Sequence, residues 1–345
     1  MKRSAFAAVW MGLVVFAAVC AGAQPLDDAG FYADYDPNLP FNVESEGVKT
    51  VDKVDEIFGV ERPMRFEKEL FSFESREGER VPSIMARPIG SEGKKLPVIL
   101  FLHGSGQKKE FIEEICTPFV EKGFAFASFD QFTRGKRQPN DNPWALMFSW
   151  RDRCWKTVND ARRMVDYLQT RDDVDPERIY LVGASYGAIT GTTVIAREKR
   201  IKAGVLVVGG GDFMTMVNAP IIQEEVGKRG LDWALELVKP IAHLIVDAAD
   251  PVHYAPGTEG TPVLMQSGSA DRLVSPEAGE KLYAALGEPK EIRWYDVDHP
   301  GLREGDGPEI VRMLDEGLEW MLERDAPYRK AQTASGTSAE TKPAG

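Results

Sequence analysis

The stretch Ile179-Tyr180-Leu181-Val182-Gly183-Ala184-Ser185-Tyr186-Gly187 is the most informative part of this 345-residue chain. Four strand-like residues lead into a G-x-S-x-G sequence, and the small residues Ala188-Ile189-Thr190-Gly191-Thr192-Thr193 follow it. In a strand–turn–helix context this pentapeptide marks a nucleophile elbow, a tight turn that exposes its serine. Side chains in place of the flanking glycines would collide with neighbouring backbone where the chain reverses. Because a serine hydroxyl is a weak nucleophile, the rest of the chain must supply a base, an acid and oxyanion donors.

The first 23 residues are typical of a secretory signal peptide. Lys2 and Arg3 precede an apolar run from Ala5 to Cys20, and Ala21-Gly22-Ala23 fits a cleavage site. We expect cleavage after Ala23 and a secreted or periplasmic protein, and an uncleaved N-terminal anchor is the alternative.

The remaining chain is long enough for one large core, as in many single-domain α/β proteins. The full chain has a net charge of −12, and loss of Lys2 and Arg3 with the signal peptide makes it −14, so no overall field attracts nucleic acid or anionic membrane. We therefore expect neither a nucleic-acid partner nor, after cleavage, a membrane partner. Export permits a disulfide, but Cys116 and Cys154 are expected on helices that follow different strands, and we expect them unpaired. Neither belongs to a spacing that indicates zinc.

Apolar runs and helical segments alternate along most of the chain, which predicts a largely parallel sheet with helices on both faces. A hairpin over residues 65–88, turning at 76–80, is expected to make one edge of the sheet antiparallel. Further strands are predicted at 97–102, 124–129, 179–182, 205–208, 263–266 and 292–295, and helices at 111–122, 158–169, 276–286 and 308–322.

Three segments are expected outside this alternating pattern. Residues 24–65 contain prolines and acidic residues and predict an irregular extension, so the α/β domain is expected over 66–325. A long connection at 214–261, with helices expected at 221–228 and 232–246, is interpreted as a lid insertion, or alternatively as structural decoration. Residues 326–345 are rich in Ala, Ser, Thr, Gly and Lys and predict a disordered tail.

Four histidines are candidates for the base. His103 directly follows an apolar strand and precedes Gly104-Ser105-Gly106, a loop better suited to present N–H donors to an oxyanion. His243 lies in an apolar helical segment and is interpreted as a buried core histidine, whereas His253 remains possible. His299 follows the last predicted strand, at the sheet edge where open α/β folds place their sites.

A base histidine needs an acid to hold its tautomer and stabilise its protonated form. Asp271 follows a predicted strand, although an ordinary helix cap is also possible there. Asp212, after Gly209-Gly210-Gly211, is the second candidate. The order Ser185, Asp271, His299 is the order found in α/β-hydrolases. His299 is the only histidine after Asp271, so the choice of this acid determines the base.

From residue 66 to residue 322 the chain resembles α/β-hydrolases of the dienelactone hydrolase, acetyl esterase and prolyl-oligopeptidase-like group. The resemblance is carried by His103-Gly104-Ser105-Gly106, Val174-Asp175-Pro176-Glu177-Arg178-Ile179 with the following Gly183 to Gly187, Gly268-Ser269-Ala270-Asp271, and Asp298-His299. It implies an α/β-hydrolase fold with Ser185 as nucleophile, His299 as base and Asp271 as the acid. The backbone N–H groups of Ser105 and Tyr186 would form the oxyanion hole. Dienelactone hydrolases usually have a cysteine nucleophile, so Ser185 favours chemistry closer to that of acetyl esterases.

The leading hypothesis is a serine hydrolase that cleaves small-molecule carboxylic esters, without metal or organic cofactor. A peptidase for short peptides is the alternative, although the chain has no N-terminal segment long enough for the propeller of prolyl oligopeptidases. A non-catalytic binding protein on the same scaffold is a third possibility. The segment 130–153 contains Phe132, Trp144, Phe148 and Trp150, which predict an apolar or sugar-stacking rim, with simple packing equally possible. The basic residues of Arg134-Gly135-Lys136-Arg137 are interpreted as a solvated turn rather than an anion site.

Overall fold

The computed structural model describes residues 35–132, 135–137, 150–230 and 246–339, together with residues 236, 239 and 243. Side chains are described as far as residue 330. The predicted signal peptide and most of the helix predicted at 232–246 lie outside the described residues.

A nine-stranded sheet forms the centre of the molecule, in the order β1-β2-β3-β5-β4-β6-β7-β8-β9. Neighbours from β5 to β9 are parallel, whereas β1–β2, β2–β3 and β3–β5 pair antiparallel. The predicted hairpin is β2–β3, and together with β1 it makes the antiparallel edge. The strands are β1 (Glu44–Ile57), β2 (Val60–Arg76), β3 (Glu79–Arg87), β4 (Leu96–Leu102), β5 (Ala125–Phe129), β6 (Val174–Ala184), β7 (Ile201–Val207), β8 (Val263–Gly268) and β9 (Lys290–Tyr295).

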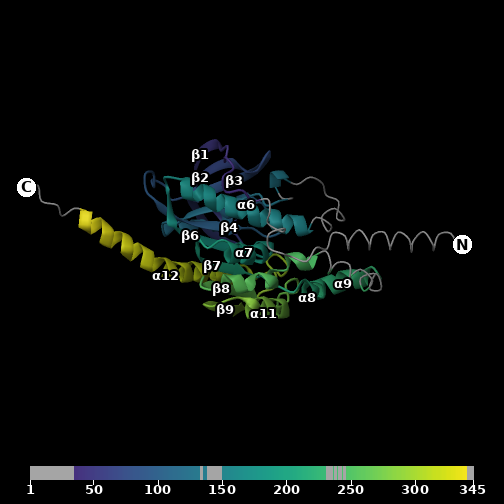
Figure 1. Cartoon of the computed structure of the whole chain (residues 1–345). Coiled ribbons are helices and arrows are strands. Elements are labelled where there is room, and N and C mark those ends of the chain that lie inside the picture. Colours follow the sequence, from purple (N-terminus) through teal and green to yellow (C-terminus); the bar gives the residue numbers. More distant parts are fainter. Residues whose placement is uncertain are drawn as a thin grey trace, which may run out of the picture.

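Helices cover both faces of this sheet, which explains why strands such as β4 and β5 are buried at every position and, apart from Ser128, apolar. One face packs against α6 (Trp150–Thr170), α7 (Tyr186–Arg197) and α11 (Pro276–Ala285). The other packs against the short helices α3 (Ile112–Ile115) and α4 (Thr117–Glu121) and against α12 (Gly307–Ala339). In Figure 1, α12 extends from the sheet toward the C-terminus. This arrangement is the predicted α/β-hydrolase fold, a mostly parallel sheet with helices on both faces.

The long connection between β7 and β8 contains α8 (Phe213–Val217), α9 (Pro220–Lys228) and the 3₁₀ turns η3 (Asp247–Ala249), η4 (Pro251–His253) and η5 (Ala255–Thr258). α9 begins one residue before the predicted helix, with Pro220 in its first turn. The Asp250 carboxylate accepts hydrogen bonds from the backbone N–H groups of Asp212 and Phe213, at 3.0 and 2.6 Å. The end of the insertion is thereby held against its beginning.

The prediction of an irregular extension is wrong for residues 44–65, because these residues form β1 and the first part of β2. The side chains of β1 are exposed or half-buried up to Asp55 and Glu56, and only Ile57 is buried. Such a strand shows no apolar alternation, since its stability comes from backbone pairing with β2. The apolar pattern that normally reveals a strand is therefore missing from its sequence.

The prediction of a disordered tail from residue 326 is wrong as far as Ala339, because α12 continues to that residue. Asp325 anchors the helix: its carboxylate accepts hydrogen bonds from the Arg178 guanidinium and the Tyr180 hydroxyl on β6. The helix predicted at 111–122 is also different, since it is divided into η1 (Lys109–Phe111), α3 and α4. Pro118 lies in the first turn of α4, where proline is tolerated although it would interrupt a continuous helix.

Candidate active site

Ser185 lies at the turn between β6 and α7, with φ 53° and ψ −117°. Its backbone N–H donates to the carbonyl oxygen of Val207, 2.8 Å away on β7. A non-glycine residue at positive φ is strained, and such residues gather at active sites. A Cβ on Gly183 would lie 2.3 Å from the carbonyl oxygen of Gly187. Only glycine permits this reversal, as expected for a nucleophile elbow.

Ser185, His299 and Asp271 form a continuous hydrogen-bonded chain. The distance between Ser185 Oγ and His299 Nε2 is 2.9 Å, and the distance between His299 Nδ1 and Asp271 Oδ2 is 2.8 Å. The other oxygen of Asp271 accepts hydrogen bonds from the N–H groups of Leu273 and Val274, at 2.8 and 2.7 Å. Asp271 is therefore held in place by backbone donors and is nearly inaccessible to solvent. All three predicted side chains meet at the carboxyl edge of the sheet.

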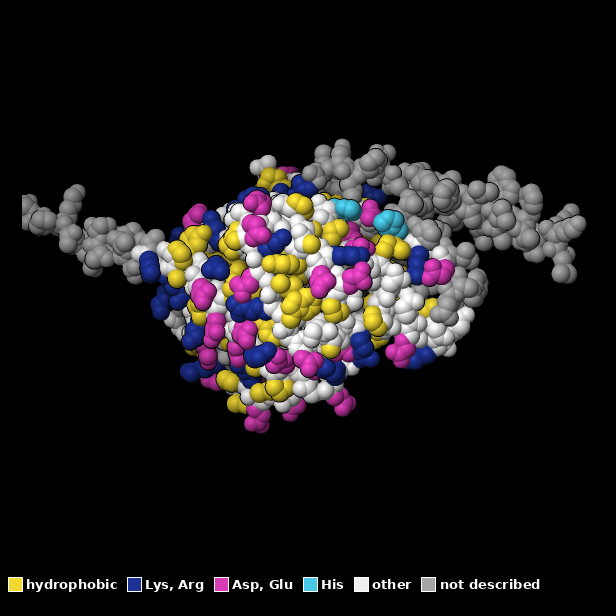
Figure 2. All heavy atoms as spheres, turned by 90° about the horizontal axis from the view of Figure 1, so that it is seen from below, with side chains coloured by type: hydrophobic (Ala, Val, Ile, Leu, Met, Phe, Trp, Pro, Cys, Tyr) yellow, Lys and Arg dark blue, Asp and Glu magenta, His cyan; other side chains and the backbone are white. Residues whose placement is uncertain are grey.

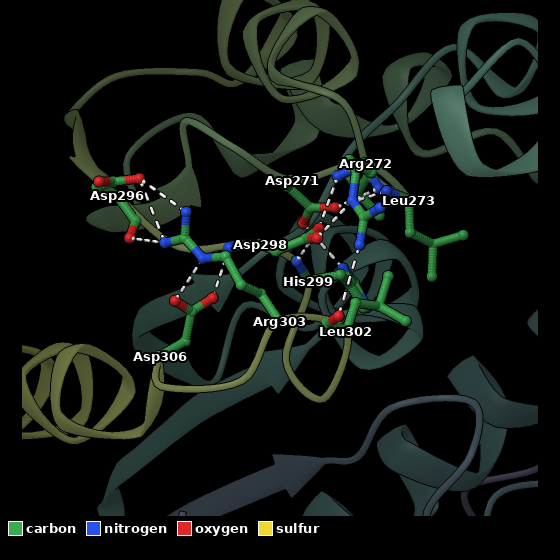
Figure 3. A network of polar contacts seen from close by, with 10 residues as sticks. Asp271, Arg272, Leu273, Asp296, Asp298, His299, Leu302, Arg303 and Asp306 are labelled. Carbon is green, nitrogen blue, oxygen red and sulfur yellow. Dashed lines mark hydrogen bonds and ion pairs between the residues drawn. The ribbon is translucent and has the colours of Figure 1, made fainter.

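A second carboxylate holds the histidine loop (Figure 3). Asp298 Oδ1 accepts from the backbone N–H groups of Arg272 and His299, and Asp298 Oδ2 accepts from the Arg272 side chain at 2.6 Å. Burial raises the pKa of the Asp298 carboxyl, but these hydrogen bonds outweigh it and hold that pKa below its ordinary value. Asp298 is thus anionic at neutral pH and joins the histidine loop to the loop that carries Asp271.

The same network continues toward α12. Asp306 accepts a hydrogen bond from the backbone N–H of Asp298 at 2.8 Å and is paired with Arg303, which also contacts Asp296 (Figure 3). The loop that carries His299 is therefore held at both ends by charged hydrogen bonds. In the sequence, Asp298 stands out only as part of the Asp298-His299 motif. The chain of contacts from Asp306 through Arg303 to Asp296 links residues that no local sequence pattern connects.

The loop after β4 borders Ser185 on the opposite side. Gly104 donates its backbone N–H to Gln107 Oε1 at 3.0 Å, and Gln131 Nε2 donates to the carbonyl oxygen of His103 at 2.8 Å. These contacts hold Ser105 beside the elbow, where it lines the same cavity as Ser185. Within the described residues, the backbone N–H groups of Ser105 and Tyr186 have no hydrogen-bond acceptor. Two backbone donors are thus available near the nucleophile.

The remaining acid and base candidates lie outside this chain of contacts. Asp212 caps α8 by accepting from the Thr215 N–H at 3.1 Å, and it pairs with Lys281. His253 contacts Asp247 at 3.2 Å on the insertion. The interpretation of His243 as a buried core histidine is wrong, because 51% of its side chain is exposed, beside Asp247. Its helical segment is apolar in sequence, but this position faces solvent.

The basic turn also differs from its prediction. Arg137 is only 9% exposed and donates to the buried carboxylate of Asp160 at 2.5 Å, so it is a structural ion pair rather than a solvated residue. Lys136 is exposed, as predicted, and Arg134 lies outside the described residues.

Cys116 and Cys154 are both buried and free. Burial raises the pKa of the Cys154 thiol to about 12, so this side chain is neutral although it lies near Tyr186. Burial also raises the pKa of the Tyr186 hydroxyl well above its ordinary value. The environment behind the elbow therefore favours neutral groups and does not activate a second nucleophile.

Two apolar cavities meet at Ser185 and share Ser105 and Leu273. The first, the His299-side pocket, measures about 370 Å³, and its walls include Phe58, Phe101, Phe111, His299, Met313 and Leu314. The second, the lid-side pocket, measures about 360 Å³, and its walls include Trp150, Tyr186, Phe213, Met216, Ile222 and Val274. Of the predicted rim, Trp150 lines the lid-side pocket, whereas Phe132 lines neither pocket and packs under Arg137 and Lys156. Trp144 and Phe148 lie outside the described residues.

Outside the site, acidic and basic side chains are interspersed on the face drawn in Figure 2. Among the described residues, no helix has the length and apolar character needed to cross a bilayer. The described part of the chain also contains no cluster of three histidine, cysteine or carboxylate side chains arranged to bind a metal.

The chain is similar in sequence to esterases and peptidases. The family model of the prolyl oligopeptidase family matches residues 134–298. The chain is 21% identical over 246 residues to Esterase YjfP of Escherichia coli, a match that covers 70% of this chain and 96% of the esterase. It is 24% identical over 268 residues to the uncharacterized peptidase YuxL of Bacillus subtilis, covering 73% of this chain and 38% of that protein.

Solved structures show the same fold. An acetyl xylan esterase from Paenibacillus sp. R4 superposes with a TM-score of 0.63 at 20% identity, covering 81% of this chain and 89% of that one. The acylaminoacyl peptidase of Pyrococcus horikoshii superposes with a TM-score of 0.59 at 19% identity, covering 77% of this chain and 45% of that one. The chain is a member of the α/β-hydrolase superfamily.

Proposed function

We propose that this protein is a secreted serine hydrolase that cleaves carboxylic esters through an acyl-enzyme, with Ser185 as nucleophile, His299 as general base and Asp271 as its orienting acid. The observation that carries the proposal is the hydrogen-bonded chain from Ser185 Oγ through His299 to Asp271, with distances of 2.9 and 2.8 Å. The strained turn at Ser185 and the backbone anchoring of Asp271 support it.

The reaction begins when Ser185 Oγ attacks the ester carbonyl and His299 Nε2 accepts the serine proton. Negative charge develops on the carbonyl oxygen, and in this proposal the N–H groups of Ser105 and Tyr186 stabilise it. The C–O bond to the alcohol then breaks, and His299 transfers its proton to the departing oxygen. Water repeats the sequence on the acyl-enzyme and releases the acid.

Asp271 accepts the hydrogen bond from His299 Nδ1 and thereby selects the tautomer whose Nε2 can accept the serine proton. It also stabilises the positive charge that forms on the ring. Its second oxygen is saturated by two backbone N–H groups, so the carboxylate has one orientation in which to perform this task.

A serine peptidase for short peptides is the second candidate. The match to the prolyl oligopeptidase family model and the superposition on an acylaminoacyl peptidase favour it. Esters and amides use the same triad, but an amide leaving group must be protonated before it departs. The two activities are therefore distinguished by comparing esters with amides of the same acyl group.

The test is hydrolysis of p-nitrophenyl acetate and butyrate and of matching amino-acid p-nitroanilides by the purified protein. Ester turnover that is lost in Ser185→Ala supports the proposal. The exposed serine in Ser45→Ala is the matched control, and this variant should retain activity because Ser45 lies on β1, away from the site. Turnover of anilides alone would replace the ester proposal with the peptidase, and full activity in Ser185→Ala would contradict both.

Secretion requires a separate test. Expression with the natural N-terminus, followed by fractionation and N-terminal sequencing, should yield a protein that begins at Gln24 outside the cytoplasm. Retention of Met1 on a cytoplasmic protein would contradict this part of the proposal.

A further inference from the structure

The two cavities on either side of Ser185 differ in their relation to His299. The His299-side pocket includes His299 together with Pro300, Gly301 and Leu302 of the loop that follows it. The lid-side pocket does not include His299 and instead contains Tyr186, whose backbone N–H is the proposed oxyanion donor. The reacting carbonyl must lie where the cavities meet, because both contain Ser185 and Ser105.

Departure of the alcohol, which completes acylation, distinguishes the two sides. His299 Nε2 must reach the oxygen of the departing alcohol in order to protonate it, within hydrogen-bond distance. The acyl group keeps its bond to Ser185 and needs no contact with the histidine. The alcohol side of the ester therefore points to the cavity that His299 borders, and the acyl side points to the lid.

We propose that the His299-side pocket binds the leaving alcohol and that its preferred occupant is an apolar alkyl or aryl group. This inference rests on the proposed function and adds the class of alcohol. The residues that define it are Phe58, Phe101, Phe111, Met313 and Leu314, which supply aromatic and aliphatic walls around a volume of about 370 Å³. Ligand pockets begin at roughly 300 Å³, so the cavity is larger than methanol or ethanol requires.

Two polar side chains of this pocket, Gln266 and Gln107, already make hydrogen bonds within the fold. Gln266 Nε2 donates to the Tyr295 hydroxyl at 3.0 Å and to the carbonyl oxygen of Met313 at 2.8 Å. Gln107 Oε1 accepts from the backbone N–H of Gly104. A sugar would bury several hydroxyl groups here with few partners, and an unpaired buried hydroxyl is unfavourable. The walls therefore select against a carbohydrate alcohol.

The turn between β1 and β2 completes the His299-side pocket. Phe58 lies at the turn between β1 and β2 with φ 53°, and its ring lies 6.3 Å from that of Phe111 in an edge-to-face arrangement. A Cβ on Gly307 would lie 1.6 Å from the Phe58 carbonyl oxygen, so the turn is packed tightly against the start of α12. The segment 44–60 thus has a role in recognising the substrate, because it places an aromatic ring over the alcohol site.

The experiment varies the alcohol while the acyl group stays constant. Initial rates are measured with methyl, propyl, butyl and phenyl acetate and with acetylated glucose, using a pH indicator to detect acetic acid. All of these substrates form the same acetyl-enzyme, so differences in kcat/KM report the acylation step alone. Burial of each methylene is worth up to about fourfold, and we expect kcat/KM to rise at least about tenfold from methyl to butyl acetate.

Two matched variants test the assignment of the pockets. Leu314→Trp fills the His299-side pocket and should reduce the butyl-to-methyl acetate ratio of kcat/KM to near unity. Ile222→Trp fills the lid-side pocket and should preserve this ratio while it reduces the preference for methyl butyrate over methyl acetate. Phe58→Ala removes an aromatic wall at the protein surface and should also reduce the butyl-to-methyl ratio, which provides a second test if Leu314→Trp does not fold.

The outcomes separate this inference from the proposed function. A flat or falling profile from methyl to butyl acetate, with measurable ester hydrolysis, overturns the apolar alcohol site and leaves the esterase intact. Exchanged effects of the two tryptophan variants overturn the assignment of the pockets. Absence of hydrolysis for every ester contradicts the proposed function itself.

Discussion

A Cβ atom on Gly187 would lie 1.8 Å from the carbonyl oxygen of Leu102, so α7 approaches the end of β4 more closely than any side chain permits. This contact places the first turn of α7, and with it the Tyr186 N–H, beside the loop that contains Ser105. The geometry of the proposed oxyanion site therefore depends on a position that has no side chain.

Gly187→Ala should consequently reduce both stability and activity. Backbone cannot move aside as a flexible side chain does, and we expect a loss of about 3 kcal/mol in the free energy of unfolding. Gly191→Ala, one turn further along α7, is the matched control: its Cβ would meet only side-chain atoms, the nearest being Leu181 Cδ2 at 3.0 Å. Urea denaturation of both variants measures the difference. Equal stability of the two variants would contradict this account of the elbow.

The two acid candidates are distinguished by amide substitution. Asp271→Asn keeps the shape of the side chain but favours the wrong histidine tautomer, and we expect kcat to fall about 10⁴-fold. Asp212→Asn affects a helix cap and the pair with Lys281, so its effect on kcat should be small. Steady-state kinetics with p-nitrophenyl butyrate compares them. A large loss in Asp212→Asn with an active Asp271→Asn would transfer the acid role to Asp212.

Asp298 is expected to act as a positioning residue through His299. Asp298→Asn removes the charge that pairs with Arg272, and a displaced histidine should lower kcat up to about 10²-fold while KM changes little. Asp296→Asn is the control, because Asp296 is 83% exposed and contacts Arg303 at the outer end of the network. If Asp298→Asn changes only the melting temperature and leaves kcat at the wild-type value, Asp298 has no positioning role.

The acid limb of the stability profile should depend on Glu79. Burial raises the pKa of this carboxyl, but hydrogen bonds from Lys156 and Arg76 outweigh burial and lower the pKa from 4.5 to about 2. A folded-state pKa below the unfolded one stabilises the protein above pH 4.5, and this stabilisation is lost as the pH falls toward 2. Glu79→Gln should reduce the loss of unfolding free energy over this interval, measured by urea titration. Glu77→Gln at the same hairpin turn is the control, and an unchanged slope in Glu79→Gln would contradict the prediction.

The sequence predicted the parallel strands and the proximity of Ser185, Asp271 and His299 well, because both follow local patterns. Apolar runs such as residues 97–102 are covered on both faces, and the G-x-S-x-G turn has steric requirements that few sequences meet. The structure brings Ser185, Asp271 and His299 together as expected from their positions after three different strands.

Other features depend on contacts between distant segments, and local patterns do not reveal them. β1 is stabilised by its pairing with β2 rather than by an apolar face, and α12 is anchored by the pair of Asp325 with Arg178. Arg137 belongs to a basic turn in the sequence but meets the buried Asp160 in the fold. Phe58 likewise lines the His299-side pocket only because the turn between β1 and β2 packs against the start of α12.

The most direct test of the central claim is the identity of the residue that becomes acylated. The protein is treated with a fluorophosphonate, which forms a stable covalent adduct with an activated serine, and the adduct is located by peptide mass spectrometry. We predict a single adduct on Ser185 in the wild type and none in Ser185→Ala, with slow labelling in His299→Ala because the base is absent. An adduct on another residue, or none on a folded protein that hydrolyses esters, would contradict the proposed mechanism.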